Sequence, residues 1–159
     1  MKLEKKIGKI LQERSLTLGL AESCTGGLVA SRITDVPGSS AYFTAGLVTY
    51  SNKAKSKFLS VPDGVIARHG AVSNIVAERM AKGVRAAAGV DVGLSITGIA
   101  GPAGGSPEKP VGTVFMALAT RKEVFVRKFY FSGNRREVRK RSSEEALIIL
   151  LDYLEGRLA

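Results

Sequence analysis

Three side chains that can act as nucleophiles stand together in the stretch AESCTGG, residues 21–27. Ser23, Cys24 and Thr25 precede two glycines, and a serine hydroxyl becomes a useful nucleophile when a neighbouring group takes its proton. An apolar run comes before the stretch and a helical pattern follows it. We therefore expect Ser23 at the carboxyl end of a strand, and Gly26 and Gly27 at the start of a helix, where ligands of open α/β sheets bind. The same residues also fit an ordinary strand-to-helix turn, so the stretch needs partners before it indicates catalysis.

The strongest candidate partner for Ser23 is a lysine in the stretch TYSNKAK, residues 49–55. Lys55 follows Ser23 by 32 residues, which is close to the length of a βαβ unit. If the two strands involved are parallel neighbours, Tyr50 and Lys55 lie over Ser23. A lysine acts as a base only when it is neutral, and burial, the nearby Lys53 or a helix N-terminus would lower its pKa. The alternative is an exposed basic helix start, which is the usual setting of a lysine.

The single histidine and the single cysteine are weaker candidates. A lone histidine just before a helix, as His69 is, is more often a loop or capping residue than a base. We interpret Cys24 as a small buried packing residue beside Ser23. One cysteine and one histidine form neither an intramolecular disulfide nor a recognisable zinc site. We expect no metal and no organic cofactor.

A tract rich in glycine and proline, GIAGPAGGSPEKPVG, covers residues 98–112 and is too long for a simple turn. Strand patterns flank it on both sides, so we interpret it as an active-site loop inside one domain and not as a linker. Its successive backbone amides can wrap a phosphate or a ribose, although glycine loops alone are weakly specific. Residues 23–27, 50–55 and 98–105 are thus all expected at the carboxyl ends of strands.

The predicted strands alternate with helices in the first part of the chain, and the last two strands follow each other directly as a hairpin. Apolar residues at helical spacing predict helices over residues 3–14, 26–36, 53–59 and 134–154, and a long alanine-rich helix within 70–90 that Ser73 caps. Strands are predicted over 16–22, 42–51, 91–98, 113–120 and 123–131, the last two as an antiparallel hairpin. The stretch VPDG is predicted to break the third helix. This order predicts one domain over residues 1–159, an α/β fold in which a mixed central sheet lies between two helical layers.

Composition limits the classes of function. The 159 residues are 45% hydrophobic and show neither a membrane-spanning stretch nor the apolar core of a signal peptide, so we expect a cytoplasmic protein. The net charge of +10 invites a nucleic-acid interpretation. Only residues 135–141 are densely basic, however, and aromatic residues for base stacking are few, so nucleic-acid binding is not expected as the main function. Arg135 and Arg139 could neutralise a phosphate, but a solvated helix face is the preferred interpretation.

Several long motifs together identify a resemblance. In order and spacing, AESCTGG, GSSAYFTAGLVTYSNKAK, HGAVS, SITGIAGPAGGSPEKPVGTV and FSGNRREVRKRSSEEAL resemble the CinA C-terminal domain family, the nicotinamide mononucleotide amidases also called PncC. The resemblance covers the chain from about Leu16 onward and implies an α/β/α sandwich that usually self-associates. It also implies the stand-alone form of the family, without the molybdopterin-binding-like module that is often joined to it.

The activity implied by the resemblance is hydrolysis of the carboxamide of nicotinamide mononucleotide to nicotinic acid mononucleotide and ammonia, in pyridine nucleotide salvage. By position, Ser23 matches the nucleophile, Lys55 the general base and Tyr50 the residue that assists them. Backbone amides of residues 25–27 are expected to stabilise the oxyanion, and the 97–105 loop to hold ribose and phosphate. The expected substrate-binding residues are Thr25, Gly26, Gly27, Thr97, Gly98, Ala100, Gly101, Gly105 and Thr113. A nucleotide-binding module without turnover and a DNA-uptake accessory protein remain as alternatives.

Overall fold

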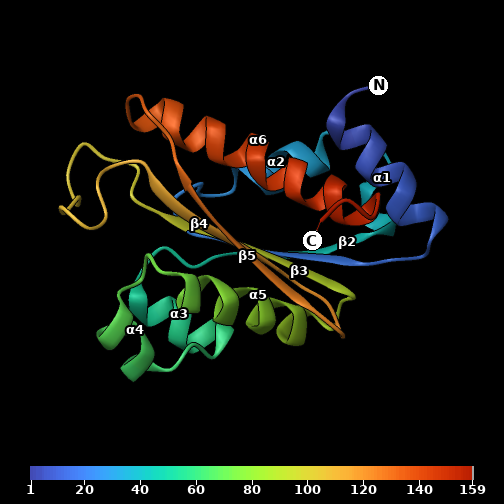
Figure 1. Cartoon of the computed structure of the whole chain (residues 1–159). Coiled ribbons are helices and arrows are strands. Elements are labelled where there is room, and N and C mark those ends of the chain that lie inside the picture. The colour runs from blue at the N-terminus through green and yellow to red at the C-terminus, as the bar shows by residue number, and fades with distance from the viewer. Residues whose placement is uncertain (159) are drawn as a thin grey trace.

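The computed structural model describes residues 1–158, in which a five-stranded sheet lies between two groups of helices. In Figure 1, α1, α2 and α6 cover one face of the sheet and α3, α4 and α5 cover the other. The predicted α/β sandwich with a mixed central sheet is confirmed. The helices are α1 (Leu3–Glu13), α2 (Leu28–Thr34), α3 (Asn52–Leu59), α4 (Asp63–His69), α5 (Asn74–Ala88) and α6 (Arg135–Leu154), with a short 3₁₀ helix at Ser39–Ala41. The strands are β1 (Leu18–Glu22), β2 (Phe43–Val48), β3 (Val92–Gly98), β4 (Thr113–Ala119) and β5 (Val124–Tyr130).

The strand order, β2-β1-β3-β4-β5, brings the predicted segments to one edge of the sheet. Strand β1 lies between β2 and β3 and runs parallel to both, with Ala21 opposite Leu47 on one side and Ser95 on the other. Strands β3, β4 and β5 are antiparallel neighbours. The carboxyl ends of β1, β2 and β3 therefore meet at the edge where β4 and α6 begin, and the predicted parallel pairing of the first two strands is confirmed.

Alternation along β1 decides which layer each side chain enters. Every residue of the strand is buried. Leu18 and Leu20 pack in the core cluster that α1, α2 and α6 share, whereas Ala21 packs with residues of α3, α4 and α5. Successive side chains point to opposite faces of a strand, so Glu22 is directed toward the α2 layer and Ser23 toward the α3 layer. Glu22 and Ser23, although adjacent in sequence, therefore face opposite helical layers.

Two predicted helix boundaries differ from the structure for local reasons. The helix predicted from residue 26 begins at Leu28, because Gly26 and Gly27 adopt φ values of +58° and +102° that do not belong to a right-handed helix. The stretch VPDG ends α3 as predicted, but it also starts α4, which the sequence pattern did not indicate. Pro62 occupies the N-cap of α4 with an extended backbone, and Asp63 places a negative charge in the first turn, which suits the start of a helix. None of the helices described within residues 1–158 is long and apolar enough to cross a membrane.

Candidate active site

A buried contact between Ser23 and Lys55 forms the centre of the site. The Lys55 Nζ atom lies 3.0 Å from Ser23 Oγ and donates a second hydrogen bond of 2.8 Å to the carbonyl of Thr49. Ser23 follows the last residue of β1, and Lys55 lies in the first turn of α3. Only 1% of the Lys55 surface is exposed, against 8% for Ser23. The sequence-predicted pair is therefore brought to hydrogen-bond distance.

Burial controls the ionisation of Lys55. Removing the ammonium from water disfavours its charged form, and this lowers the pKa of Lys55 below the ordinary 10.5. Lys53, which the sequence suggested as a neighbouring cause, is exposed, and burial itself is the main cause. Within residues 1–158, no carboxylate forms an ion pair with Lys55 that would restore the charged form. This lowering of the Lys55 pKa is in the direction that a general base requires.

The lowered pKa of Lys55 predicts a pH dependence of stability. Between the folded-state pKa and 10.5 the unfolded chain binds the proton more tightly, so the free energy of unfolding rises with pH across that window. Lys55→Met removes this group and keeps the length of the side chain. We expect the difference in free energy of unfolding between wild type and Lys55→Met to shift in favour of wild type as pH rises toward 10.5. Urea unfolding of both proteins at a series of pH values measures it, and parallel curves would contradict the assignment.

Tyr50 and Arg135 form the rim of the site. One guanidinium nitrogen of Arg135 donates a hydrogen bond of 2.6 Å to the Tyr50 hydroxyl, and another donates one of 2.7 Å to the carbonyl of Gly101. Tyr50 is 58% exposed. Its hydroxyl is thus paired with Arg135 rather than with Ser23 or Lys55. Arg135, which begins α6, ties the end of β2 to the glycine-rich loop.

Glu22 organises the turn that carries Ser23. Its buried carboxylate accepts four hydrogen bonds, one of 2.6 Å from the Thr25 hydroxyl and three from the amides of Gly27, Val29 and Ala30 at 3.0–3.2 Å. These amides belong to the start of α2, where a negative charge is favoured. The anion site that the sequence placed at this helix start is therefore filled by the protein's own carboxylate.

The predicted oxyanion donors need revision because several of these amides are already paired. Gly27 donates to Glu22, and the Gly26 amide donates to the carbonyl of Ser23. By contrast, the amides of Cys24 and Thr25 donate no hydrogen bond within residues 1–158. The carbonyls of these same two residues accept hydrogen bonds of 3.0 and 3.2 Å from Arg139 of α6. The turn is held from both sides, and the Cys24 and Thr25 amides are the donors that remain available.

A cleft of about 270 Å³ opens over the Ser23–Lys55 pair. Seven sequence-predicted site residues line it: Ser23, Lys55, Tyr50, Thr97, Gly98, Ala100 and Gly101. Five others do not line it: Thr25, Gly26, Gly27, Gly105 and Thr113. The hydroxyls of Thr25 and Thr113 are buried in hydrogen bonds to Glu22 and to the carbonyl of Pro110, and Gly105 packs beside Val111. Cys24 lines it too, and so do further residues of the two segments expected at the site, Asn52, Ile99, Ala103 and Gly104. Ala71 and Val72 are the lining residues that no sequence pattern placed there, and Arg135 adds a positive charge.

Cys24 and His69 do not offer an alternative nucleophile or base. Burial raises the pKa of the Cys24 thiol to about 12, so the thiol is protonated at neutral pH and the reactive thiolate is scarce. His69 is exposed at the end of α4 and does not line the cleft; its carbonyl accepts a hydrogen bond from Lys109. Among residues 1–158, no group of three or more histidine, cysteine or acidic side chains is placed to hold a metal ion.

Comparison with solved structures finds the same fold at recognisable sequence identity. A competence-damaged protein (CinA) superfamily protein from Klebsiella pneumoniae superposes with a TM-score of 0.93 at 32% identity, covering 97% of this chain and 96% of its own. The competence/damage inducible protein CihA from Agrobacterium tumefaciens gives a TM-score of 0.92 at 39% identity, covering 96% of this chain and 93% of its own.

Curated relatives are more similar in sequence and much longer. A putative competence-damage inducible protein from Caldanaerobacter subterraneus subsp. tengcongensis is 54% identical over 155 residues, which is 98% of this chain and 38% of the relative. A CinA-like protein from Citrifermentans bemidjiense is 55% identical over 155 residues, 98% of this chain and 37% of the relative. The chain thus spans well under half the length of these relatives. The sequence profile of one family matches residues 1–154, and the chain belongs to that family, the CinA C-terminal domain.

Proposed function

We propose that the protein is a nicotinamide-nucleotide amidase, which hydrolyses the carboxamide of nicotinamide mononucleotide to nicotinic acid mononucleotide and ammonia. The observation that carries the proposal is the buried Ser23–Lys55 contact at the floor of a cleft. A serine beside a lysine of lowered pKa is an arrangement suited to acyl transfer. The resemblance of the surrounding motifs to nicotinamide mononucleotide amidases supports the choice of substrate.

Acylation uses groups that the structure brings together. Neutral Lys55 accepts the proton of Ser23 while Ser23 Oγ forms a bond to the carboxamide carbon, and the carbonyl oxygen takes the negative charge. The free amide of Cys24, which lines the cleft, is the first candidate to stabilise this oxyanion, and the free amide of Thr25 lies next to it in the turn. Such a donor contributes about 3 kcal/mol in other hydrolases. The carbon–nitrogen bond then breaks, and the nitrogen leaves as ammonia with a proton returned by Lys55.

Deacylation repeats the same steps with water. Lys55 accepts a proton from water, the resulting oxygen nucleophile attacks the ester carbonyl, and Ser23 Oγ leaves and recovers its proton. The sum is one amide and one water converted to one carboxylic acid and ammonia. In this scheme the protein supplies the nucleophile, the base and the oxyanion donors.

The remaining lining residues are proposed to hold the rest of the mononucleotide. The loop from Gly98 to Gly101 presents backbone groups to the ribose and phosphate, and Arg135 supplies positive charge at the rim. The Thr97 hydroxyl donates to the carbonyl of Ala71 and so supports the wall of the cleft. Binding groups remote from the reacting amide contribute energy that orients it over Ser23.

Incubation of the pure protein with nicotinamide mononucleotide tests the proposal directly. We expect ammonia and nicotinic acid mononucleotide to appear in equal amounts, measured by coupled assay and chromatography. Free nicotinamide is the matched control, because it has the carboxamide but neither ribose nor phosphate, and we expect much slower turnover. Absence of ammonia release, combined with tight, salt-dependent binding of DNA, would overturn the proposal in favour of a DNA-related accessory role.

A further inference from the structure

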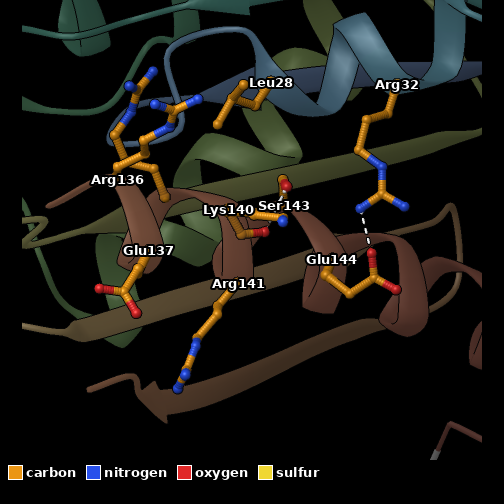
Figure 2. Close-up of a pocket in the computed structure, with 9 residues that line it drawn as sticks. Leu28, Arg32, Arg136, Glu137, Lys140, Arg141, Ser143 and Glu144 are labelled. Carbon is orange, nitrogen blue, oxygen red and sulfur yellow. Dashed lines mark hydrogen bonds and ion pairs between the residues drawn. The ribbon is translucent and has the colours of Figure 1, made fainter. Parts of the chain in front are cut away.

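A second and larger hollow lies between α2 and α6, behind the turn that carries Ser23. Its volume is about 770 Å³, against about 270 Å³ for the cleft. Leu28 and Arg32 line it from α2, and Arg136, Lys140 and Glu144 line it from α6, in each case at the spacing of one helical turn (Figure 2). We call this hollow the α2–α6 groove.

The α2–α6 groove carries cations that lack acidic partners. Its lining contains five basic and two acidic residues. Arg32 is neutralised by ion pairs with Glu4 and Glu144, the second of which is drawn in Figure 2. Within residues 1–158, Arg136 and Lys140 form no ion pair with any carboxylate. Neighbouring cations without counter-charges repel each other, and an anion in the groove would relieve this repulsion.

The acidic residues of the lining limit the length of the ligand. Figure 2 shows Glu144 toward one end of the α2–α6 groove, where it pairs with Arg32, and Glu137 toward the other, where its carboxylate accepts a hydrogen bond from the Asn134 amide. A nucleic-acid strand that continued beyond the groove at either end would bring its phosphates near one of these carboxylates. A short ligand with clustered phosphates instead meets Arg136, Lys140 and the guanidinium of Arg139, and Leu28 with the arginine and lysine stems offers an apolar surface for a base.

We propose that the α2–α6 groove binds a nucleoside di- or triphosphate, and that its occupancy is communicated to Ser23 through Arg139. Arg139 lines the groove and also donates the two hydrogen bonds to the carbonyls of Cys24 and Thr25. A phosphate is a stronger acceptor for a guanidinium than a peptide carbonyl is. A bound phosphate therefore competes for Arg139, loosens the turn and slows acylation of Ser23. This effect on acylation rests on the proposed function, whereas nucleotide binding in the groove does not.

Calorimetric titration at fixed ionic strength tests the binding, with ADP, ATP and inorganic tripolyphosphate as probes. We expect the Arg136→Ala/Lys140→Ala double variant to bind them at least about tenfold more weakly. The matched control is Arg121→Ala/Lys122→Ala, which removes two exposed cations from the β4–β5 turn, outside the groove. Equal weakening in both variants would show general charge attraction only and overturn the site. Tighter binding of a single-stranded oligonucleotide than of ATP would overturn the choice of a short ligand.

The rate of ammonia release from nicotinamide mononucleotide tests the communication. We expect ATP to lower kcat in wild type and in the Arg121→Ala/Lys122→Ala control, and to leave kcat unchanged in the double groove variant. An increase of KM alone would mean that ATP competes in the cleft and would overturn the communication through Arg139. If no ammonia is released by any variant, the proposed function fails while the titrations still decide whether the groove binds nucleotides.

Discussion

Ser23→Ala is expected to lower kcat for nicotinamide mononucleotide by about 10⁴-fold or more, because Ser23 carries the hydroxyl that contacts the proposed base, Lys55. The Cys24 thiol beside it is buried, with its pKa raised to about 12, and cannot substitute. The measurement is steady-state ammonia release. The matched control is Ser31→Ala, since Ser31 is exposed on α2 and outside the cleft.

Substitution of Lys55 tests the proposed general base in the same assay of ammonia release. Lys55→Met keeps an unbranched side chain of similar length but removes the base, and we expect a loss of about 10³-fold in kcat. Lys53→Met alters an exposed lysine two residues earlier on the same helix and should leave the rate within about twofold of wild type, as surface changes usually do. Mass spectrometry of enzyme quenched during turnover should find the acyl group on Ser23. An active Ser23→Ala enzyme would refute the nucleophile assignment.

The Ser23–Lys55 pair was predictable because its geometry follows from strand order. A spacing of 32 residues fits one βαβ unit, and parallel strands deliver both segments to the same edge of the sheet. The strands themselves follow from their β-branched and apolar runs, and α5 from its Ser73 cap. Local chemistry and one rule of topology thus account for the layers and for the centre of the site. Self-association, implied by the resemblance, stays a prediction.

The supporting contacts could not be predicted because they join segments far apart in the chain. Arg135 and Arg139 reach the site from α6, 85 residues after Tyr50 and 115 after Cys24. In the sequence these arginines belong to a basic run that also fits a solvated helix face. No short-range pattern shows that Arg139 bonds the carbonyls of the nucleophile turn. The placement depends on the packing of α6 over the sheet edge, which only the folded structure shows.

Glu22 was missed for a different reason, although a signal was present. A glutamate that ends a buried strand and precedes a Ser-Cys-Thr-Gly-Gly turn is directed, by alternation, to the face opposite Ser23. That face holds the start of α2, whose unpaired amides attract a carboxylate. The free helix start expected for the substrate was therefore already occupied by the protein itself.

Glu22→Ala is expected to destabilise the protein by about 3–5 kcal/mol, because it leaves four donors without their acceptor in a largely buried place. The same change frees the turn that positions Ser23 and the Cys24 and Thr25 amides, so kcat should fall even where the protein remains folded. Glu22→Gln retains one acceptor oxygen but loses the negative charge at the helix start, and a smaller loss of about 1–2 kcal/mol is expected. Urea unfolding of the three proteins gives these differences.

Comparison of the free energies of unfolding of Glu22→Ala and Glu22→Gln distinguishes a hydrogen-bonding role of the carboxylate from a merely electrostatic one. If the carboxylate acts as a shared acceptor, alanine costs clearly more than glutamine; if only its charge matters, the two substitutions cost the same. Glu108→Ala, in the exposed part of the glycine-rich loop, is the matched control and should change stability by less than about 0.5 kcal/mol. A Glu22→Ala protein as stable and as active as wild type would mean that the turn is fixed by Arg139 and its glycines alone. In that case, placing the nucleophile would depend on α6 rather than on the strand that carries it.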